Sequence, residues 1–304
     1  DYALLGDALY DEGRIAEAAD AYQQMVNLKP SLDSYARAAN IRWIKGDLAG
    51  AIELQTLAVR SGGAADPGAL AWSLARLAQL VWQEGDAKAA AALATRALEV
   101  APDFQPALLL QGRLLLAGGK GAESVILLAR AAEILPLPES RWAYAEALRA
   151  AGREALAVEV EDRLVREGLA EDPRTVAMFL ATRGRDPELA LRLAAAELKN
   201  RADVMTRGVN ALTLVNAGRV DEALIHLREA QREGTADARL LLHVGRAAAL
   251  AHQPDAGDLL HRAERLIHLL LPSEQRLLEN SLSLLSAGSG PTSDKKETTH
   301  QKTS

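Results

Sequence analysis

The stretch YDEGRIAEAADAY, from Tyr10 to Tyr22, joins two helical segments through a single glycine, Gly13, and places an alanine five residues after it. Variants of the same phrase recur along the chain, among them IKGDLAGAIEL, QEGDAKAAAAL, AAGREALAVEV and NAGRVDEALIHL. A glycine tolerates the left-handed backbone conformation that ends a helix. The repeated phrase therefore predicts the elbow of a helix hairpin, built several times over.

The elbow glycines recur at nearly fixed intervals. They are Gly13, Gly46, Gly85, Gly119, Gly152, Gly184 and Gly218, with successive spacings of 33, 39, 34, 33, 32 and 34 residues. The one long spacing contains an inserted loop, RSGGAADPGALA, from Arg60 to Ala71. A period of about 34 residues is typical of an array of stacked two-helix repeats.

Two further positions in each unit hold small residues. Five residues after the glycine lie Ala18, Ala51, Ala90, Ser124, Ala157 and Ala223, with Ala190 displaced by one; seven before it lie Gly6, Ala39, Ala78, Gly112, Ala145, Ala177 and Ala211. Small side chains at a helix crossing let two backbones approach closely and gain dispersion contacts. Several units then end with a proline, which lacks the amide donor of a continuing helix. These prolines are Pro30, Pro102 and Pro136.

This pattern of small residues, elbow glycine and terminal proline resembles the tetratricopeptide repeat. The resemblance covers about residues 1–271 as seven clear units and a weaker eighth, in which HQPD replaces the elbow glycine. The unit around Gly184 departs from the pattern because its first helix is short. The resemblance implies an all-α fold, a right-handed α-solenoid of stacked antiparallel helix hairpins.

After the repeats, the segment PSEQRLLENSLSLL predicts one more amphipathic helix, over about residues 273–287 with Ser273 as its N-cap. Its apolar face is expected to hold Leu277, Leu278, Leu282 and Leu285. An array leaves an apolar side on its last hairpin, so this helix is expected to cap a solenoid spanning residues 1–287. Residues 288–304 have no aliphatic side chain and are rich in Gly, Ser, Thr and Lys, which predicts a disordered tail.

Composition excludes several classes of protein. The net charge of −6 gives no overall field that attracts phosphates, so nucleic acid is not expected as a partner, and a pentatricopeptide array reading RNA would need a basic groove. The chain has no cysteine, which rules out disulfides and zinc–thiolate sites. No apolar run reaches the roughly 18 residues of a membrane-spanning helix.

The histidines are the best candidates for catalysis or metal binding, and they do not support either. His226, His243, His252, His261 and His268 lie near one end of the sequence. The last two are seven residues apart, which is too far for two ligands of one ion on a single helix, where a spacing of four is needed. The GGKG around Lys120 lacks the flanking pattern of a phosphate-binding loop. We therefore expect no enzyme activity, no metal and no cofactor.

The first helix of each tetratricopeptide hairpin lines the concave face of the array, and the residues nine, six and three before each glycine form a stripe along it. In the first four units the polar and aromatic members of this stripe are Asp7, Tyr10, Arg37, Asn40, Trp43, Arg76, Gln79, Trp82 and Arg113. The same places in the seventh unit are the apolar Val209, Leu212 and Val215. The stripe predicts a peptide-binding groove in the N-terminal half. Packing of the aromatic residues within their own hairpins stays open as a second interpretation.

These residues predict a non-catalytic scaffold for protein–protein interaction that binds a peptide or protein in its concave groove. An extended acidic segment is the candidate partner, because Arg37 and Arg76 occupy equivalent places in successive units. The carboxylate clamp of the family is matched in part, by Arg76 and Asn40, whereas its lysines are replaced by Ala3 or Ala36 and by Trp72.

An alternative follows from the first residues, DYALLGDAL, which read as the middle of a helix and do not begin with methionine. The chain would then be the repeat region of a larger protein, an enzyme regulator or an exported assembly factor, with another domain upstream. The composition fits a bacterial cytoplasm or periplasm and leaves open which of the two holds the protein, and it leaves the oligomeric state open as well.

Overall fold

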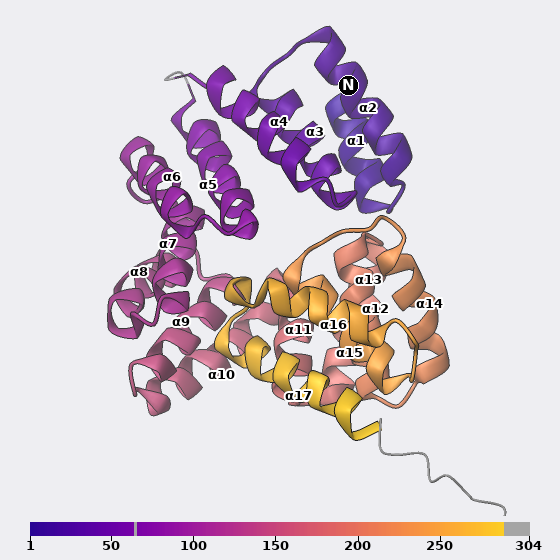
Figure 1. Cartoon of the computed structure of the whole chain (residues 1–304). Helices are drawn as coiled ribbons and strands as arrows, with labels where there is room; N and C mark the ends of the chain where they lie inside the picture. Colours follow the sequence, from indigo (N-terminus) through magenta and orange to yellow (C-terminus); the bar gives the residue numbers. More distant parts are fainter. Residues whose placement is uncertain (64–65, 289–304) are drawn as a thin grey trace, which may run out of the picture.

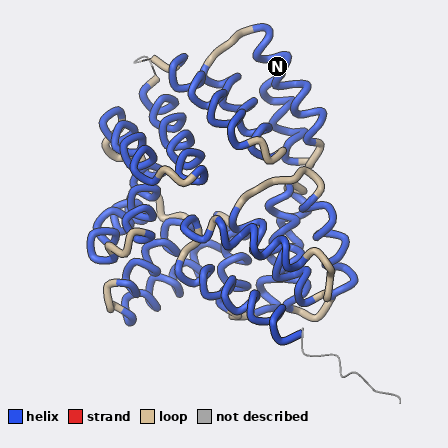
Figure 2. The backbone as a smooth tube through the Cα atoms, in the orientation of Figure 1, coloured by secondary structure: helices blue, strands red, loops and turns tan. Residues whose placement is uncertain are grey.

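The computed structural model describes residues 1–63 and 66–288, which form 17 α-helices, one short 3₁₀ helix and no strand (Figures 1 and 2). Sixteen of these helices pair into eight hairpins: α1 (Tyr2–Asp11) with α2 (Ile15–Leu28), α3 (Leu32–Ile44) with α4 (Leu48–Ser61), α5 (Pro67–Glu84) with α6 (Ala87–Val100), α7 (Gln105–Ala117) with α8 (Gly121–Ile134), α9 (Pro138–Ala150) with α10 (Glu154–Glu171), α11 (Pro173–Arg183) with α12 (Pro187–Asn200), α13 (Val204–Asn216) with α14 (Val220–Gln231), and α15 (Ala238–Leu250) with α16 (Ala256–Arg265). The 3₁₀ turn (Ile267–Leu269) and α17 (Pro272–Gly288) follow.

The elbows and helix crossings lie where the sequence predicts them. All seven elbow glycines have positive φ, between 64° and 111°, and His252 takes the same role in the eighth hairpin with φ of 53°. All fourteen small residues at the crossings are buried. A Cβ atom added to Gly6 would lie 2.3 Å from the ring of Tyr22, and one added to Gly112 would lie 2.4 Å from Leu128. The predicted solenoid of helix hairpins is confirmed, including the short α11.

The solenoid curls back on itself, so that the elbows of α1–α2 and α3–α4 meet the segments that precede α13 and α15 (Figure 1). The amide of Ala202 donates to the carbonyl of Asp11 at 2.8 Å, and the hydroxyl of Thr235 donates to the carbonyl of Ile44. Nε2 of His268 lies 3.0 Å from the carbonyl oxygen of Trp82. The last two contacts join residues 191 and 186 positions apart, close to five and a half repeats. Elbows of the first turn therefore meet connecting segments of the second.

Apolar packing accompanies these backbone contacts. One core cluster contains Leu9, Ile15 and Ile44 from the first two hairpins together with Leu214 and Leu241 from the last two. Burial of apolar surface is the main favourable contribution to packing of this kind. The two turns are consequently joined by a shared hydrophobic core as well as by hydrogen bonds.

Helix α17 begins at Pro272, one residue before its predicted start. Ser273 is therefore not the N-cap; its hydroxyl instead accepts a hydrogen bond from Nε1 of Trp142 at 3.2 Å. The four leucines of the predicted apolar face all pack into the core, with Leu278 fully buried. The helix contacts α15 and α16 and also α11, so it covers the last hairpin and continues across the inner face of earlier ones.

The apolar stripe of the seventh unit is closed off inside the molecule. Val209, Leu212 and Val215 are all buried, and Val209 shares a core cluster with Leu271 in the segment before α17. These residues therefore offer no open groove. Apart from Gly288, which ends α17, the predicted tail of residues 288–304 lies outside the described residues.

Candidate functional site

A cleft of about 770 Å³ runs along the first helices of the first three hairpins, α1, α3 and α5, with Pro106 of α7 at one end. Seven of the nine residues in the predicted groove line this cleft: Asp7, Tyr10, Arg37, Asn40, Trp43, Arg76 and Gln79. Regular hairpin geometry brings these seven side chains together, because residues at equivalent places before each elbow point to the same side of the array. The volume lies within the usual range of ligand-binding pockets.

Asp7 and Arg37 form an internal pair at one side of the cleft. Nε and Nη2 of Arg37 each donate to the carboxylate of Asp7 at 2.9 Å, and the hydroxyl of Tyr22 donates to the same carboxylate at 2.7 Å. The hydrogen bond from Arg37 holds the pKa of Asp7 below its usual value. The pair joins α1, α2 and α3, so the charge of Arg37 is already neutralised within the protein.

Arg76 occupies the equivalent place on α5 and has different surroundings. Its guanidinium lies over the ring of Trp43, 4.6 Å from the ring centre, and donates to the side-chain oxygens of Gln79 at 3.2 Å and Asn40 at 3.4 Å. Among the described residues no carboxylate forms an ion pair with it. Burial lowers the pKa of Arg76, but an arginine stays charged at neutral pH. The cleft therefore contains one oriented positive charge without a counter-ion.

A relay of two hydrogen bonds fixes the ring under Arg76. Nε1 of Trp43 donates to the side chain of Gln83 at 2.8 Å, and Gln83 in turn donates to the carbonyl of Ala236 at 2.8 Å. Ala236 belongs to the second turn of the superhelix, in the segment before α15. The closure of the superhelix thus positions an aromatic wall of the cleft. The sequence gives no local sign of this role for Gln83, because its partner is 153 residues away.

Two further residues of the cleft extend the predicted stripe by one helical turn. Trp72 lies four residues before Arg76 on α5 and is 46% exposed, and Asp33 holds the equivalent place on α3. Both lie thirteen residues before their elbow glycine, and continuing the register of the stripe by one turn finds them. Trp72 places a large apolar surface within the cleft.

Trp82 and Arg113, the other two predicted residues, do not line the cleft. The ring of Trp82 packs edge-on against His268 at 6.1 Å, and Nη2 of Arg113 donates to the carbonyl of Leu269 at 2.6 Å. Arg113 also pairs with Glu139 at 3.3 Å. The segment between α16 and α17 therefore occupies the surface that these two side chains would otherwise present.

Within the described residues, no group of three or more His, Asp or Glu side chains is arranged to hold a metal ion. None of the helices there combines the length and the hydropathy that crossing a membrane requires.

The stacked hairpins define an α-solenoid of two-helix repeats. Residues 3–69 and 75–137 match the family described as the tetratricopeptide repeat. The first four hairpins therefore carry tetratricopeptide repeats, and helix hairpins continue along the chain through α16. Such repeats generally mediate protein–protein interaction and generally act as non-catalytic scaffolds.

Several solved structures are similar to this one. A tetratricopeptide repeat protein from Parabacteroides merdae is 16% identical, with 84% of this chain and 98% of that chain covered and a TM-score of 0.43. MamA is 16% identical over 53% of this chain and 92% of its own, with a TM-score of 0.42. PilF of Pseudomonas aeruginosa is 17% identical over 65% and 89%, with a TM-score of 0.48. A search of the curated proteins finds no match.

Proposed function

We propose that the chain is a non-catalytic scaffold that binds an extended segment of a protein partner in the cleft along α1, α3 and α5. Arg76 recognises an acidic residue of that segment, and Trp43 and Trp72 pack against its apolar side chains. The observation that carries the proposal is the guanidinium of Arg76, held over Trp43 and between two amide side chains without a carboxylate partner among the described residues.

The energetics favour an anionic partner at this place. A charge that is partly removed from water costs free energy unless an opposite charge or hydrogen bonds compensate for it. The two amide oxygens near Arg76 compensate in part and leave donors on the guanidinium unused. A carboxylate from a ligand would complete these bonds in a planar, two-pronged geometry that suits arginine.

Arg37 and Arg76 take different roles in the proposal, although they occupy equivalent sequence positions. The carboxylate of Asp7 already satisfies Arg37 with two hydrogen bonds of 2.9 Å. A ligand would have to displace Asp7 to use that charge. We therefore assign Arg37 to the stability of the first hairpins and Arg76 to binding.

The test is calorimetry with synthetic peptides of about ten residues, which contain Asp or Glu beside leucine or aromatic residues. The Arg76→Gln variant should bind the best peptide roughly 10–100-fold more weakly, because a charge-assisted hydrogen bond contributes about 1.5–3 kcal/mol. Arg96→Gln is the matched control, since Arg96 is exposed on α6 and outside the cleft. Equal affinities of wild type and Arg76→Gln would refute the role of Arg76, and no binding by any peptide would refute the site.

A further inference from the structure

A second cavity, of about 370 Å³, lies where α17 crosses the ends of α11 and α13 near the start of α12. Three arginines line it, Arg183, Arg185 and Arg246, each from a different place in the fold: the end of α11, the following elbow, and α15. None of the described residues that line it is an aspartate or a glutamate. The wall of this cavity is therefore positively charged.

Of the three arginines that line the cavity, Arg246 has the fewest partners. Its Nη1 donates to the hydroxyl of Ser281 on α17 at 3.2 Å, whereas its Nε is buried and has no hydrogen-bond partner. Among the described residues it forms no ion pair. Burial lowers the pKa of Arg246, and no neighbouring carboxylate offsets that effect. A partly buried guanidinium in these surroundings lacks the counter-ion that normally accompanies one.

Thr182 supplies an independent observation on the same cavity. Its side chain is only 8% exposed and lines the cavity, and its Oγ1 is buried without a hydrogen-bond partner. Most buried hydroxyl groups in proteins are bonded, because leaving one unpaired costs free energy. An acceptor within the cavity would satisfy it.

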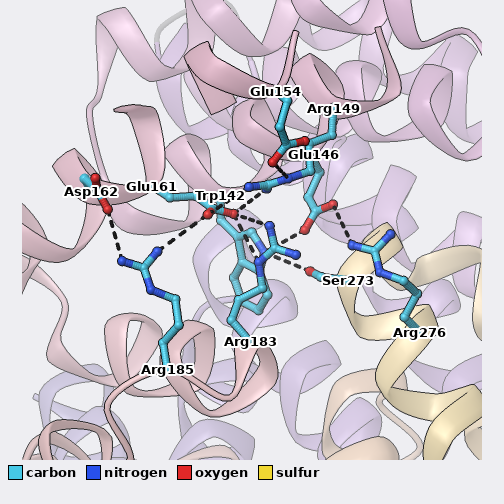
Figure 3. A network of polar contacts seen from close by, with 10 residues as sticks. All are labelled: Trp142, Glu146, Arg149, Glu154, Glu161, Asp162, Arg183, Arg185, Ser273 and Arg276. Carbon is cyan, nitrogen blue, oxygen red and sulfur yellow. Dashed lines mark hydrogen bonds and ion pairs between the residues drawn. The ribbon is translucent and has the colours of Figure 1, made fainter. Parts of the chain in front are cut away.

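The other two arginines of the cavity are paired with carboxylates and hold the hairpins together. Figure 3 shows Arg149, Arg183 and Arg185 converging on the single carboxylate of Glu161. Arg185 also pairs with Asp162 at 3.0 Å. Arg149 pairs with Glu154 as well, so three carboxylates balance these three guanidinium groups, and Arg246 is left as the arginine of the cavity without a carboxylate partner among the described residues.

We propose that this cavity binds the oxyanion of a small molecule, a carboxylate or a phosphate group, with Arg246 and the hydroxyl of Thr182 as its donors. Arg183 and Arg185 shape the wall of the cavity and keep their bonds to Glu161. The space is large enough for the anionic group and part of the molecule that bears it. The site shares no lining residue with the cleft on α1, α3 and α5, so a negative result at one site does not bear on the other.

The test is calorimetry on the full chain with inorganic phosphate and, separately, with acetate, each against sodium chloride of equal ionic strength. We expect one molecule of oxyanion to bind per chain, and the anion that binds more tightly identifies the chemistry of the natural ligand. Arg246→Gln should weaken that binding roughly 10–100-fold. Arg192→Gln is the matched control, because it removes the same charge from an exposed place on α12 outside the cavity, and it should bind like wild type.

Thr182→Val is a second variant that keeps the shape of the side chain and removes the unpaired hydroxyl. It should weaken binding several-fold while leaving the thermal midpoint of the free protein unchanged or higher, since no hydrogen bond is lost. Absence of binding by both anions would overturn the proposal. Equal affinity of wild type and Thr182→Val would also overturn it. This second comparison can be made even if Arg246→Gln fails to fold.

Discussion

At the scale of single residues, a glycine on α1 allows a tyrosine of α2 to reach a charged pair beside the cleft. Gly6 on α1 leaves room for the ring of Tyr22, and a Cβ atom there would lie 2.3 Å from that ring. Tyr22 can then reach Asp7, which in turn holds Arg37. A small residue at a helix crossing therefore sets the position of a charged pair beside the cleft.

Overpacking of one crossing should destabilise the protein. Ala157 is fully buried at the crossing of the fifth hairpin, so Ala157→Leu should lower the free energy of unfolding by about 1–3 kcal/mol. Ala155→Leu is the matched control, because Ala155 is exposed two residues earlier on the same helix. Urea denaturation measures both variants. Equal midpoints would show that Ala157 does not lie at a tight crossing.

Acidification should selectively remove the contribution of Asp7. Its pKa is lower in the folded state than in the unfolded state, so its ionised form stabilises the protein above the unfolded pKa, and this contribution is lost as the pH falls through the folded pKa. At pH 7 we expect Asp7→Asn to cost about 1 kcal/mol, because the pair is partly exposed. The difference from wild type should close on titration towards pH 2. Asp20→Asn, at an exposed position of α2, should show no comparable change.

At the scale of helices, α10 joins its neighbours through a single buried carboxylate. Glu161 accepts hydrogen bonds from Arg149 at the end of α9 and from Arg183 at the end of α11 (Figure 3). Burial opposes the ionisation of Glu161, but these bonds outweigh it and hold its pKa below the usual value. Each partner depends on the others, since a buried charge that loses its counter-ion is costly.

Neutralising this carboxylate should weaken the packing of α9, α10 and α11. We expect Glu161→Gln to lower the free energy of unfolding by about 3–5 kcal/mol at pH 7, because it leaves the partly buried guanidinium groups of Arg149 and Arg183 without the carboxylate that they share. Glu159→Gln, at an exposed position on the same helix, should change it by less than about 0.5 kcal/mol. Denaturation curves that coincide for the two variants would contradict the structural role of Glu161.

The helices also show which features the sequence predicts and which it does not. The elbows and crossings were predictable because glycine conformation and small side chains act within one hairpin. The start of α17 was not, because the hydroxyl of Ser273 bonds to Trp142, 131 residues earlier, instead of capping its own helix. The same distinction divides the candidate site. Seven residues follow the local register, whereas Trp82 and Arg113 are covered by a segment more than 150 residues away.

At the scale of the whole molecule, contact between successive turns makes the array more than a chain of neighbouring units. The elbow at Gly46 approaches the carbonyl oxygen of Gly234, which would lie 2.7 Å from an added Cβ atom. The shared core cluster extends over the same region. We therefore expect the first and last hairpins to unfold together rather than separately.

Two glycine variants separate this contact from the local cost of a left-handed residue. Gly46 and Gly119 have φ values of 78° and 75°, but a Cβ atom at Gly119 meets nothing within 4 Å. Gly119→Ala should cost about 1–2 kcal/mol from backbone strain alone. Gly46→Ala should cost more, and amide hydrogen exchange should become faster over α13–α16. Equal costs and unchanged exchange would show that the turns do not support each other.

The near-constant separation between contacting turns also fixes a property that repeat arrays usually leave free, which is the number of their repeats. In an open solenoid each unit touches only its neighbours, so a unit can be duplicated or lost with little effect elsewhere. Here one additional unit between α4 and α13 would bring the first two elbows opposite the wrong partners, and Gly46 would no longer face Gly234. A gene that encodes repeats changes most simply by duplicating or losing a single unit. We therefore expect neither change to be tolerated between α4 and α13.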